Sequence, residues 1–588
     1  MKKGLLSLLL MMAGMAVYAV PAKQEWQTRT QSDGSTIEVM QLGDEFCHFL
    51  INRDGRQVRE NENGMYEVIG AAPTPAQIRA RRAQARARRA PQSVGTEPNL
   101  APKGVVILAN FKDSEMKAAH TQATFDELCN STHCTVNNGF PSAAQYFADQ
   151  SNGAYRPVFD VFGPVNLSRK TEYYGKDIKD RDAGDDEHAA DAVVEACRLA
   201  NQQFTINWAD YDSDNDGYVD FVYLIYAGKG QADGGAETTI WPHNWSIAAA
   251  RELYINGDEY GRGGTIHYCT YTQSQCILGG KEINMYACSS ELSGSSLCGI
   301  GTLCHEFGHV MGLPDLYDTE YGDNYTNSLT PTKWSIMDQG CYNGSGHCPC
   351  NYDPWSKAFF GWTESRNLGL AGRVLTLKAN GVEGGKSYQI NFTGEHQKAT
   401  DPGWCYYLEN RQQQGWDTHL PGHGLLVWKV NYSEDAWSSN APNNTGTVAS
   451  PLFSISSAYG TKIGTTADGP YNTFPGEANV TSVTLIEDQP ITDITETDGV
   501  ISLVFIHPYT SYEVKWVVNG EVIESREYNV EGVDLELPDT PFEVCEGTHF
   551  IGWTKHTEWC DPFNNPGDLF KKASGQVTGP VTYYAVFE

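Results

Sequence analysis

The sequence predicts an α/β domain that is followed by a mainly-β domain and by a small β-rich C-terminal module. Two buried apolar runs, at residues 104–111 and 221–226, predict strands, and residues 186–203 between them repeat apolar side chains with the period of a helix. Over residues 365–507 the helical period fades, and short strand-like runs alternate with Gly, Asn, Pro and Asp turns. Residues 509–588 are again rich in strand-like runs.

The composition is that of a globular protein with several domains. The chain has 588 residues, of which 40% are hydrophobic and 20% are charged. Domains of about 100–200 residues would divide such a length into about three to five units. The formal net charge is 42 − 73 = −31. So acidic a chain lacks the basic surface that nucleic-acid binding needs, and we expect no nucleic-acid partner.

Residues 1–19 have the pattern of a secretory signal peptide, with a basic start, an apolar run and Ala19 at the cleavage position. The run of about 12 apolar residues is shorter than the roughly 20 that span a bilayer, so we expect no transmembrane segment. The pattern predicts a secreted or cell-surface protein. An oxidising location also suits the 15 cysteines and favours disulfide bonds between close pairs, namely Cys129/Cys134, Cys269/Cys276 and Cys545/Cys560.

Residues 20–100 precede the predicted α/β domain, residues 101–362, and have the character of a removable pro-segment. Their first part is polar and strand-like, with turn signals at residues 32–34 and 53–55. Residues 79–89 then contain six arginines and no apolar stripe. This stretch is either a solvated linker or a protease-accessible junction between a pro-segment and the mature protein, and the two interpretations are compatible.

The clearest chemical signal is the sequence HEFGHVMGLPD, which covers residues 305–315. On a helix, His305 and His309 lie one turn apart on the same face, where two neutral imidazoles can bind one Zn²⁺. Glu306 follows the first histidine directly. Its carboxylate can act as a general base on a water molecule at the metal without being a ligand. The pattern therefore indicates a zinc peptidase.

The residues that follow this helix can supply a third zinc ligand. Gly312 allows the chain to leave the helix sharply, and Pro314 prevents the helix from resuming. Asp315 can then turn back to the metal, and Asp318 is the alternative third ligand. A catalytic zinc has three protein ligands and keeps one position open for water.

The longer stretch HEFGHVMGLPDLYD, residues 305–318, resembles the active-site signature of the immune inhibitor A family of secreted bacterial metallopeptidases, which is grouped with the metzincins. Metzincins carry a methionine beneath the metal, and Met337 in the segment WSIMD is the match. In some metzincins a tyrosine two places later touches the metal, but this chain has Gln339 there. The resemblance covers roughly residues 100–500 and implies a metzincin-like α/β catalytic domain that acts on protein or peptide substrates.

The resemblance extends more loosely to residues 20–100, which would be the pro-segment of a zymogen. How such a segment would inhibit is left open by the sequence. Cys47 could donate a thiolate to zinc, because thiolate is a good zinc ligand, and a carboxylate from Asp44 or Glu45 could do the same. A core thiol or an incidental thiol is the favoured interpretation of Cys47.

A second ion site is predicted in the acidic loop of residues 212–220. Aspartates occupy positions 1, 3, 5 and 9, and glycine at position 6 permits the tight bend, as in a Ca²⁺ loop. Position 12 is Tyr223, where an EF-hand has a bidentate glutamate, so an acidic turn without an ion is the alternative. The candidate calcium ligands are Asp212, Asp214, Asp216, Tyr218 and Asp220.

Together these features predict a secreted zinc-dependent peptidase, and the family resemblance implies that it is an endopeptidase; residues 363–507 would form a second, mainly-β domain. Residues 509–588 resemble the small β-rich repeats of bacterial surface proteins, internalin-type repeats included, and cell-surface attachment is a hypothesis that depends on this analogy. The alternative function is a non-catalytic zinc- and calcium-binding surface adhesin. Glu306 favours the enzyme, because a structural zinc needs no adjacent base and prefers four protein ligands.

Overall fold

The structure is a computed structural model of the chain, and it describes residues 20–44, 47–61, 63–74, 76–78, 80–81, 98, 100–177, 186–256, 264–318, 330–444, 451–458, 472–506, 512–528, 549–555 and 581–587. The predicted signal peptide, residues 1–19, lies outside the described residues, and so do residues 82–89 of the arginine-rich stretch. Cys545 and Cys560, which form one of the predicted disulfide pairs, also lie outside them.

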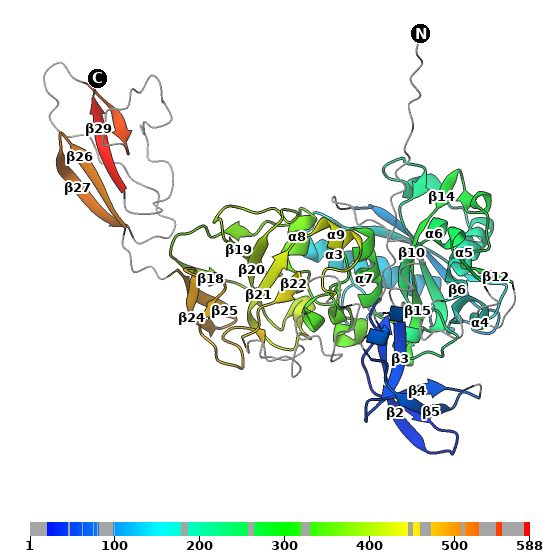
Figure 1. The fold of residues 1–588 in the computed structure, drawn as a ribbon. Helices are drawn as coiled ribbons and strands as arrows, with labels where there is room; N and C mark the ends of the chain where they lie inside the picture. The colour runs from blue at the N-terminus through cyan, green and yellow to red at the C-terminus, as the bar shows by residue number, and fades with distance from the viewer. Residues whose placement is uncertain are drawn as a thin grey trace, which may run out of the picture.

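The centre of the molecule is a six-stranded mixed sheet in residues 101–362, the central α/β region (Figure 1). Four of its strands are parallel, and one edge strand, β10, runs antiparallel to β15. The strands predicted at residues 104–111 and 221–226 are confirmed as β6 and β9. In sheet order the strands are β10 (His243–Ser246), β15 (Met285–Ser293), β9 (Val222–Lys229), β6 (Lys103–Asn110) and β7 (Val158–Asn166), and β16 (Ser296–Leu297) pairs with β15.

Helices pack against this sheet, with α2 and α5 in contact with β7 and α7 in contact with β15. The predicted helix of residues 186–203 is confirmed as α5, although it begins at Ala189. Asp186 lies before the helix, and its carboxylate accepts a hydrogen bond from the backbone N–H of Trp241 at 2.9 Å. The helices of the region are α2 (Gln122–Asn130), α3 (Ala143–Gln150), α4 (Thr171–Gly175), α5 (Ala189–Gln203), α6 (Ile247–Glu252), α7 (Gly301–Val310) and α8 (Pro354–Phe359).

Several short elements lie in the loops of the central α/β region. They comprise a hairpin, a small three-stranded sheet and several 3₁₀ helices, of which η6 contacts α7. The strands are β11 (Tyr254–Asn256), β12 (Thr265–His267), β8 (Tyr218–Val219), β13 (Ile277–Leu278) and β14 (Lys281–Ile283), and the 3₁₀ helices are η1 (Trp208–Tyr211), η2 (Gln231–Asp233), η4 (Gln273–Gln275), η5 (Thr332–Trp334) and η6 (Gln339–Gly346).

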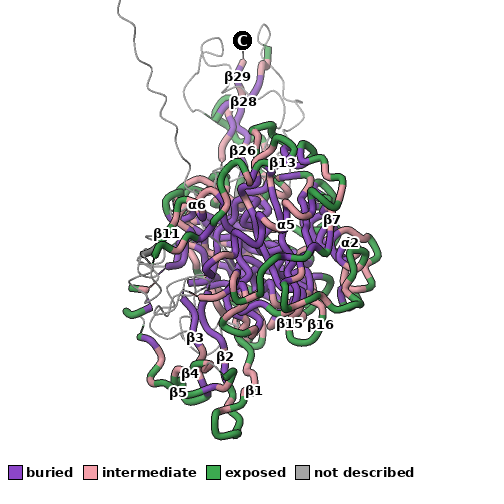
Figure 2. Tube along the Cα trace, turned by 90° about the vertical axis from the view of Figure 1, so that its right-hand side faces the viewer, coloured by how far each residue is buried: buried purple, intermediate pink, exposed green. Residues whose placement is uncertain are grey.

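The N-terminal sheet is a five-stranded antiparallel meander in strand order β1 to β5. Its turns contain Gly34 and Gly55, whose φ angles of +83° and +70° suit glycine, as the turn signals predict. Figure 2 shows that β1, β4 and β5 lie at the periphery and are largely exposed or half-buried. The strands are β1 (Gln27–Thr30), β2 (Thr36–Asp44), β3 (Cys47–Asn52), β4 (Arg56–Glu60) and β5 (Tyr66–Ala71).

The second β region, residues 363–506, contains two sheets, in agreement with the predicted mainly-β character. Its single α-helix among the described residues is α9 (Glu434–Ser438), which follows the longest pair of strands. The first sheet has the order β17 (Arg366–Asn367), β19 (Tyr388–Asn391), β20 (Trp404–Arg411), β21 (Gly424–Asn431) and β22 (Phe453–Ile455), and the second has the order β18 (Arg373–Leu377), β25 (Val500–Phe505), β24 (Pro490–Thr497) and β23 (Val483–Thr484).

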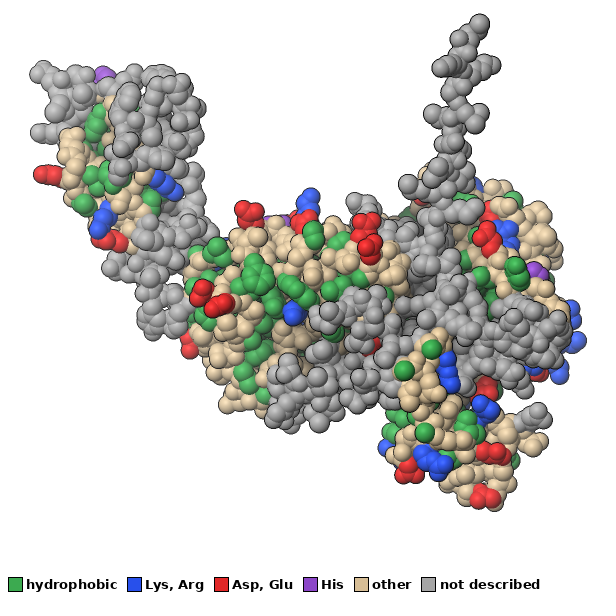
Figure 3. All heavy atoms as spheres, in the orientation of Figure 1, with side chains coloured by type: hydrophobic (Ala, Val, Ile, Leu, Met, Phe, Trp, Pro, Cys, Tyr) green, Lys and Arg blue, Asp and Glu red, His purple; other side chains and the backbone are tan. Residues whose placement is uncertain are grey.

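A third β unit, the C-terminal sheet, lies at the end of the molecule away from the N-terminal sheet (Figure 1). It has its own small core around Trp516 and Trp553. On the face drawn in Figure 3, acidic side chains are scattered over the described surface, in keeping with the net charge of −31. The strands, in sheet order, are β27 (Glu521–Tyr528), β26 (Tyr512–Val518), β29 (Val581–Phe587) and β28 (Phe550–Thr554).

The largest hydrophobic core is shared by the central α/β region and the second β region. Phe307 of α7 and Trp355 of α8 belong to the same cluster of buried side chains as Trp428 of β21 and Trp437 of α9. The aromatic rings of Trp355 and Trp437 lie 5.4 Å apart. Burying such large side chains dominates the packing energy, so these two regions stabilise one another.

The predicted disulfides Cys129/Cys134 and Cys269/Cys276 are not formed in the structure, where all four residues are free cysteines. Cys129 is fully buried in the main core, whereas Cys134 lies on a partly exposed loop, so the two thiols occupy different environments. The Cys276 thiol donates instead to the carbonyl oxygen of Thr272 at 3.4 Å. Within the described residues, no helix combines the length and the hydropathy of a membrane span.

Candidate metal centre

Helix α7 presents the histidines and the glutamate of the HEFGH sequence. All ten of its residues are buried, and it is apolar on every side apart from these polar groups. The helix ends where the sequence predicts, because Gly312 has a φ of +105°, which favours glycine, and the Leu313 N–H bonds the Gly308 carbonyl at 3.0 Å. The chain then reverses and brings Asp315 back to the helix.

Met337 packs against helix α7 at Gly308. A Cβ atom on Gly308 would lie only 2.7 Å from the Met337 sulfur, so the helix needs glycine at this position. The Leu316 N–H donates to the Met337 carbonyl at 2.8 Å. The segment around Met337 therefore supports both the helix and the loop that follows it, as the resemblance to a Met-turn implies.

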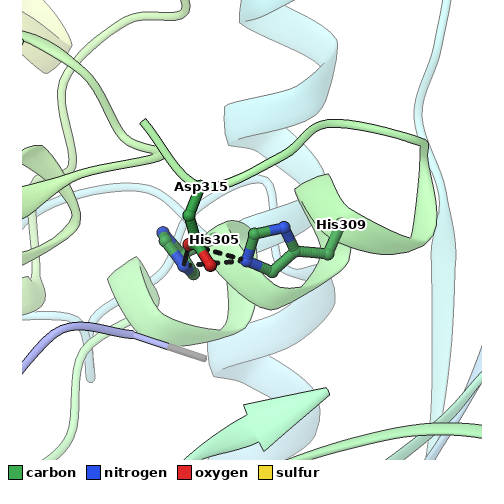
Figure 4. A group of neighbouring side chains, drawn as sticks. All are labelled: His305, His309 and Asp315. Atoms are coloured by element: carbon green, nitrogen blue, oxygen red, sulfur yellow. Dashed lines mark hydrogen bonds and ion pairs between the residues drawn. The ribbon is translucent and has the colours of Figure 1, made fainter. Parts of the chain in front are cut away.

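His305, His309 and Asp315 meet in the interior with their side chains fully buried (Figure 4). The Nε2 atoms of the two histidines are 3.0 Å apart. Asp315 Oδ1 lies 3.3 Å from Nε2 of His305 and 3.2 Å from Nε2 of His309. Three atoms that each lie 2.0–2.1 Å from a tetrahedral zinc are about 3.3 Å apart, so the spacing fits this metal.

The other ring nitrogens determine where the histidine lone pairs point. Nδ1 of His305 donates to the Ile336 carbonyl at 2.7 Å, and Nδ1 of His309 donates to the Leu313 carbonyl at 2.8 Å, because a carbonyl oxygen only accepts. In a neutral imidazole Nε2 is then an acceptor. Two nitrogen lone pairs and a carboxylate oxygen thus converge on one buried point, and a divalent cation satisfies all three together.

The pKa shifts of His309 and Asp315 favour the protonation states in which these two residues bind a metal. Burial lowers the pKa of His309 and outweighs the opposing effect of Asp315, so the neutral imidazole is favoured at neutral pH. Burial opposes ionisation of Asp315, but its polar contacts with His309 and His305 outweigh burial and hold the pKa of this carboxyl well below its usual range. Neutral histidines and an ionised aspartate are the forms that bind zinc.

Asp318, the alternative third ligand, is buried but lies outside this group. Among the described residues, the set of possible metal ligands that contains both histidines is completed by Asp315. The assignment of these three residues as zinc ligands stays a prediction, for which the geometry gives a physical basis.

The first described residues of the chain pack beside Glu306, and one of them is hydrogen-bonded to its carboxylate. The Val20 N–H donates to Glu306 Oε1 at 3.1 Å, and the Trp241 indole N–H donates to the Val20 carbonyl at 3.1 Å. The Tyr342 hydroxyl donates to the Pro21 carbonyl at 2.9 Å. Val20, Pro21 and Ala22 are all buried, so an extended segment occupies the space beside the predicted general base.

Cys47 and Asp44, two of the residues proposed from sequence to block the metal, lie in strands of the N-terminal sheet. Cys47 packs in a small cluster of the N-terminal sheet with Leu42, Phe49 and Ile78, which agrees with a buried core thiol. The Asp44 carboxylate accepts from the Cys47 N–H at 3.1 Å, and Glu45 lies outside the described residues.

The acidic loop brings Asp212, Asp214 and Asp216 within 4.8 Å of one another through their carboxylate oxygens. Asp212 accepts from the Asp216 N–H at 3.0 Å and is in contact with the Lys281 ammonium. Burial raises the pKa of Asp216, and the neighbouring aspartates raise it further. The side chains converge as a calcium loop requires, but Lys281 supplies positive charge that the sequence pattern did not reveal.

Asp220 and Tyr218 are not part of this group of three. The Asp220 carboxylate accepts from the Ser213 N–H at 3.0 Å, which closes the loop, and Tyr218 follows as the first residue of β8, with an exposed side chain. All five candidate calcium ligands stay predictions.

The comparisons with known proteins agree with the geometry. Residues 107–368 match the immune inhibitor A peptidase M6 catalytic domain. This stretch begins in β6 and ends in the first strands of the second β region, so it includes α7, the metal loop and Met337. The match supports a metalloendopeptidase, a hydrolase that acts on peptide bonds.

Three relatives resemble part of the chain. Immune inhibitor A of Bacillus thuringiensis subsp. alesti is 26% identical over 337 residues, which cover 54% of this chain and 44% of that protein. Pre-pro-metalloprotease PrtV of Vibrio cholerae serotype O1 is 26% identical over 279 residues, or 42% of this chain and 28% of that protein. A protein of Arthroderma benhamiae that is named a secreted metallopeptidase is 24% identical over 218 residues, or 34% of this chain and 29% of that protein. The chain spans less than half the length of these relatives.

Two groups near the centre were not found from sequence. Asn440, in the second β region, is paired with Asp315, and Val20 lies on Glu306. Asn440 belongs to a Ser-Asn-Ala-Pro-Asn-Asn stretch that has the composition of any turn, and Val20 has no chemical signature at all. Contacts across 125 and 286 residues leave no local pattern to detect.

Proposed function

We propose that this protein is a secreted zinc-dependent endopeptidase with a metzincin-like centre that hydrolyses extracellular proteins or peptides. His305, His309 and Asp315 would hold the zinc, which supplies Lewis acidity towards the scissile carbonyl and lowers the pKa of the attacking water. The single observation that carries this proposal is the convergence of two Nε2 lone pairs and one carboxylate oxygen within 3.0–3.3 Å at a buried point.

Glu306 would be the general base and acid of the reaction. It follows His305 on the same helix, so its carboxylate can take a proton from the attacking water and deliver it to the leaving nitrogen. The Val20 N–H donates to Oε1 at 3.1 Å, so this carboxylate oxygen is within hydrogen-bond reach of a polypeptide backbone. Met337 would keep α7 and the metal loop in register.

Residues 20–100 would be the pro-segment, and residues 79–100 would contain the activation cleavage. Val20–Ala22 fill the space beside Glu306, so a polypeptide substrate and this segment cannot bind there together. Export by a signal peptide that ends at Ala19 would leave Val20 as the first residue.

The acidic loop would bind Ca²⁺ as a stabilising site, with Asp212, Asp214 and Asp216 as the central ligands. Millimolar Ca²⁺ should raise the thermal unfolding temperature of the parent chain but not that of an Asp214→Asn/Asp216→Asn double variant. An equal response of both proteins would remove calcium from the proposal. The C-terminal sheet would be an attachment or spacing module at the cell surface.

The decisive experiment compares Glu306→Gln with the parent chain in digestion of casein after processing of the pro-segment. We expect kcat to fall about 10²–10⁴-fold, because the general base is lost. The zinc content should stay near one ion per chain, since Glu306 is not a ligand. Activity of the parent should disappear with o-phenanthroline and return with zinc. Full activity in the variant would exclude Glu306 from the reaction, and an inactive zinc-loaded parent would favour the surface adhesin.

A further inference from the structure

The predicted zinc ligand Asp315 is held by a residue of the second β region. The Asn440 side-chain amide donates from Nδ2 to Asp315 Oδ2 at 2.7 Å, and its Oδ1 accepts from the Asp315 backbone N–H at 2.7 Å. Both residues are buried, with exposed fractions of 2% and 0%. One amide therefore binds the side chain and the main chain of the same aspartate, although 125 residues separate them.

The conformation of Asn440 is fixed by its own surroundings. It follows α9 with a φ of +52°, a left-handed conformation that asparagine tolerates better than most residues. Its N–H donates to the Trp437 carbonyl at 3.0 Å, and the Ala441 N–H donates to the Ala436 carbonyl at 2.8 Å. Trp437 is in turn part of the shared aromatic core, so the amide is presented from a rigid base.

A second asparagine in the same turn has a different task. The Asn443 amide donates to the carbonyl oxygens of Leu316 and Phe453, each at 2.6 Å, and accepts from the Phe453 N–H at 2.8 Å. Asn443 thus ties the metal loop to β22 through backbone atoms alone. Of the two asparagines, only Asn440 contacts the carboxylate of Asp315.

The Asn440 contact selects which oxygen of Asp315 faces the histidines. Oδ2 is engaged by the Asn440 amide, and Oδ1 is the atom that lies 3.2–3.3 Å from the two histidine Nε2 atoms. Without the amide the carboxylate could rotate about its Cβ–Cγ bond, because no backbone restraint fixes that torsion. Hydrogen bonds that hold a metal ligand typically matter about 10–100-fold for metal affinity.

We propose that Asn440 is a positioning residue of the metal centre, which fixes the Asp315 carboxylate so that a single oxygen binds the metal. This inference depends on the proposed function, because it presumes that zinc occupies the cluster. It also implies that the working catalytic unit extends past residue 368 into the second β region, since Asn440 lies 72 residues beyond the end of the matched catalytic domain, at 440 − 368.

The test uses substitutions that keep the left-handed backbone of residue 440. Asn440→Gly removes the amide without strain, and Asn440→Asp keeps the acceptor for the Asp315 N–H but replaces the donor with an oxygen that faces Oδ2. Asn443→Ala is the matched control, because it loosens the same loop without touching the carboxylate. Alanine at 440 is avoided, since its positive φ would add strain of its own.

Zinc affinity of the full chain is measured by competition with a chromophoric chelator, together with thermal unfolding of the metal-free proteins. We expect Asn440→Gly and Asn440→Asp to weaken zinc binding about 10–100-fold. Asn443→Ala should lower the thermal unfolding temperature about as much as the Asn440 variants do. It should nevertheless bind zinc nearly as tightly as the parent. In the processed, zinc-saturated enzyme the Asn440 variants should lower kcat and leave KM nearly unchanged.

Two results would overturn the inference. Zinc affinity of both Asn440 variants equal to that of the parent would show that Asp315 needs no orientation from this amide. Equal loss of affinity in Asn443→Ala would show that only the position of the loop matters. A parent chain that fails to bind zinc, or that digests casein equally well with Glu306→Gln, would instead refute the proposed function itself, so the two failures are distinguishable.

Discussion

The N-terminal region, which comprises residues 20–26 and the N-terminal sheet that follows, and the second β region both reach the candidate metal centre, but they are attached to the protein in different ways. The second β region shares its largest core with the central α/β region, through Trp428 and Trp437 among others. The N-terminal sheet has only small clusters of its own, and Val20 and Ala22, which precede the sheet, are the residues of the N-terminal region that enter the main core. The second β region is therefore an integral part of the centre, whereas the N-terminal region only packs against it.

The polar contacts follow the same division. From the second β region, Asn440 supports the Asp315 carboxylate, so its contact helps to build the centre. From the N-terminal region, Val20 precedes the sheet and donates to Glu306, so its contact would block the proposed centre. A shared core of large aromatic side chains costs more to separate than two small core residues, one stacked imidazole and a few hydrogen bonds. A zymogen needs this asymmetry, because one neighbour must be lost on activation and the other must stay.

The largest effect is expected at the buried ion network that joins the second β region to the central α/β region. Arg411 of β20 is fully buried and bonds Asp417 through two nitrogens at 2.6 and 2.7 Å, and Glu409 at 3.0 Å. It also reaches the Asn351 carbonyl at 3.3 Å. Arg411→Ala would leave two carboxylates buried without their partner, and we expect a loss of about 3–5 kcal/mol in urea unfolding.

The matched control for this variant is Arg53→Ala in the N-terminal sheet. Arg53 pairs with Glu38 on the surface, where both side chains are about half exposed, so we expect no measurable change in stability. The α/β and second β regions should unfold in one transition in both variants. Separate transitions, or equal stability losses in the two variants, would contradict the view that the second β region is integral to the centre and that the N-terminal region only packs against it.

The local parts of this arrangement were predictable from sequence. The apolar runs of β6 and β9, the period of α5, and the helix that carries His305 and His309 are patterns of neighbouring residues. The turn at Gly312 is equally local, because a positive φ after a helix favours glycine. These features lie within a few residues of their cause, so one sequence suffices to find them.

The contacts that distinguish the two neighbouring regions could not be predicted in that way. The pairing of Asn440 with Asp315, the place of Val20 on Glu306, and the contact of Lys281 with Asp212 all join distant parts of the chain. A polar residue in a turn looks the same whether its amide faces water or a buried carboxylate. The sequence therefore located the candidate metal ligands, whereas the residues that support them and the segment that covers Glu306 required the fold.

An intermediate effect is expected when the packing of the N-terminal region against the centre is weakened at Ala22. This residue is 1% exposed, and its N–H donates to the Gly43 carbonyl at 2.7 Å. Ala22→Glu would overfill the space, at a cost of about 1–3 kcal/mol, which is roughly a 5- to 150-fold rise in the fraction of open centres. The basal peptidase activity of the unprocessed chain should rise by that factor. Gln24→Glu adds the same charge at an exposed position two residues later and should leave basal activity unchanged.

The smallest effect is expected from pH, through His48 of β3. This imidazole is buried, stacks on Trp241 with ring centres 4.5 Å apart, and lies 3.3 Å from the Asp177 carboxylate and 2.8 Å from the Gln231 amide. Burial lowers the pKa of His48, but the negative charge of Asp177 and hydrogen bonds to Asp177 and the Asp44 carbonyl outweigh it, so the pKa lies above its usual value. The contact therefore contributes its full stability below the unfolded pKa, about 6.5, and loses it as the pH rises through the folded pKa.

The N-terminal sheet should consequently hold the centre closed more firmly in acid than at neutral pH. The measurement is the ratio of the activity of the unprocessed chain to that of the processed enzyme at each pH, because the ratio cancels the pH dependence of catalysis. We expect this ratio to rise a few-fold as the pH increases past 6.5, and to become flat in His48→Phe, which keeps the stack on Trp241 and cannot titrate. A slope that persists in His48→Phe would assign the pH dependence to another group and leave His48 as a packing contact only.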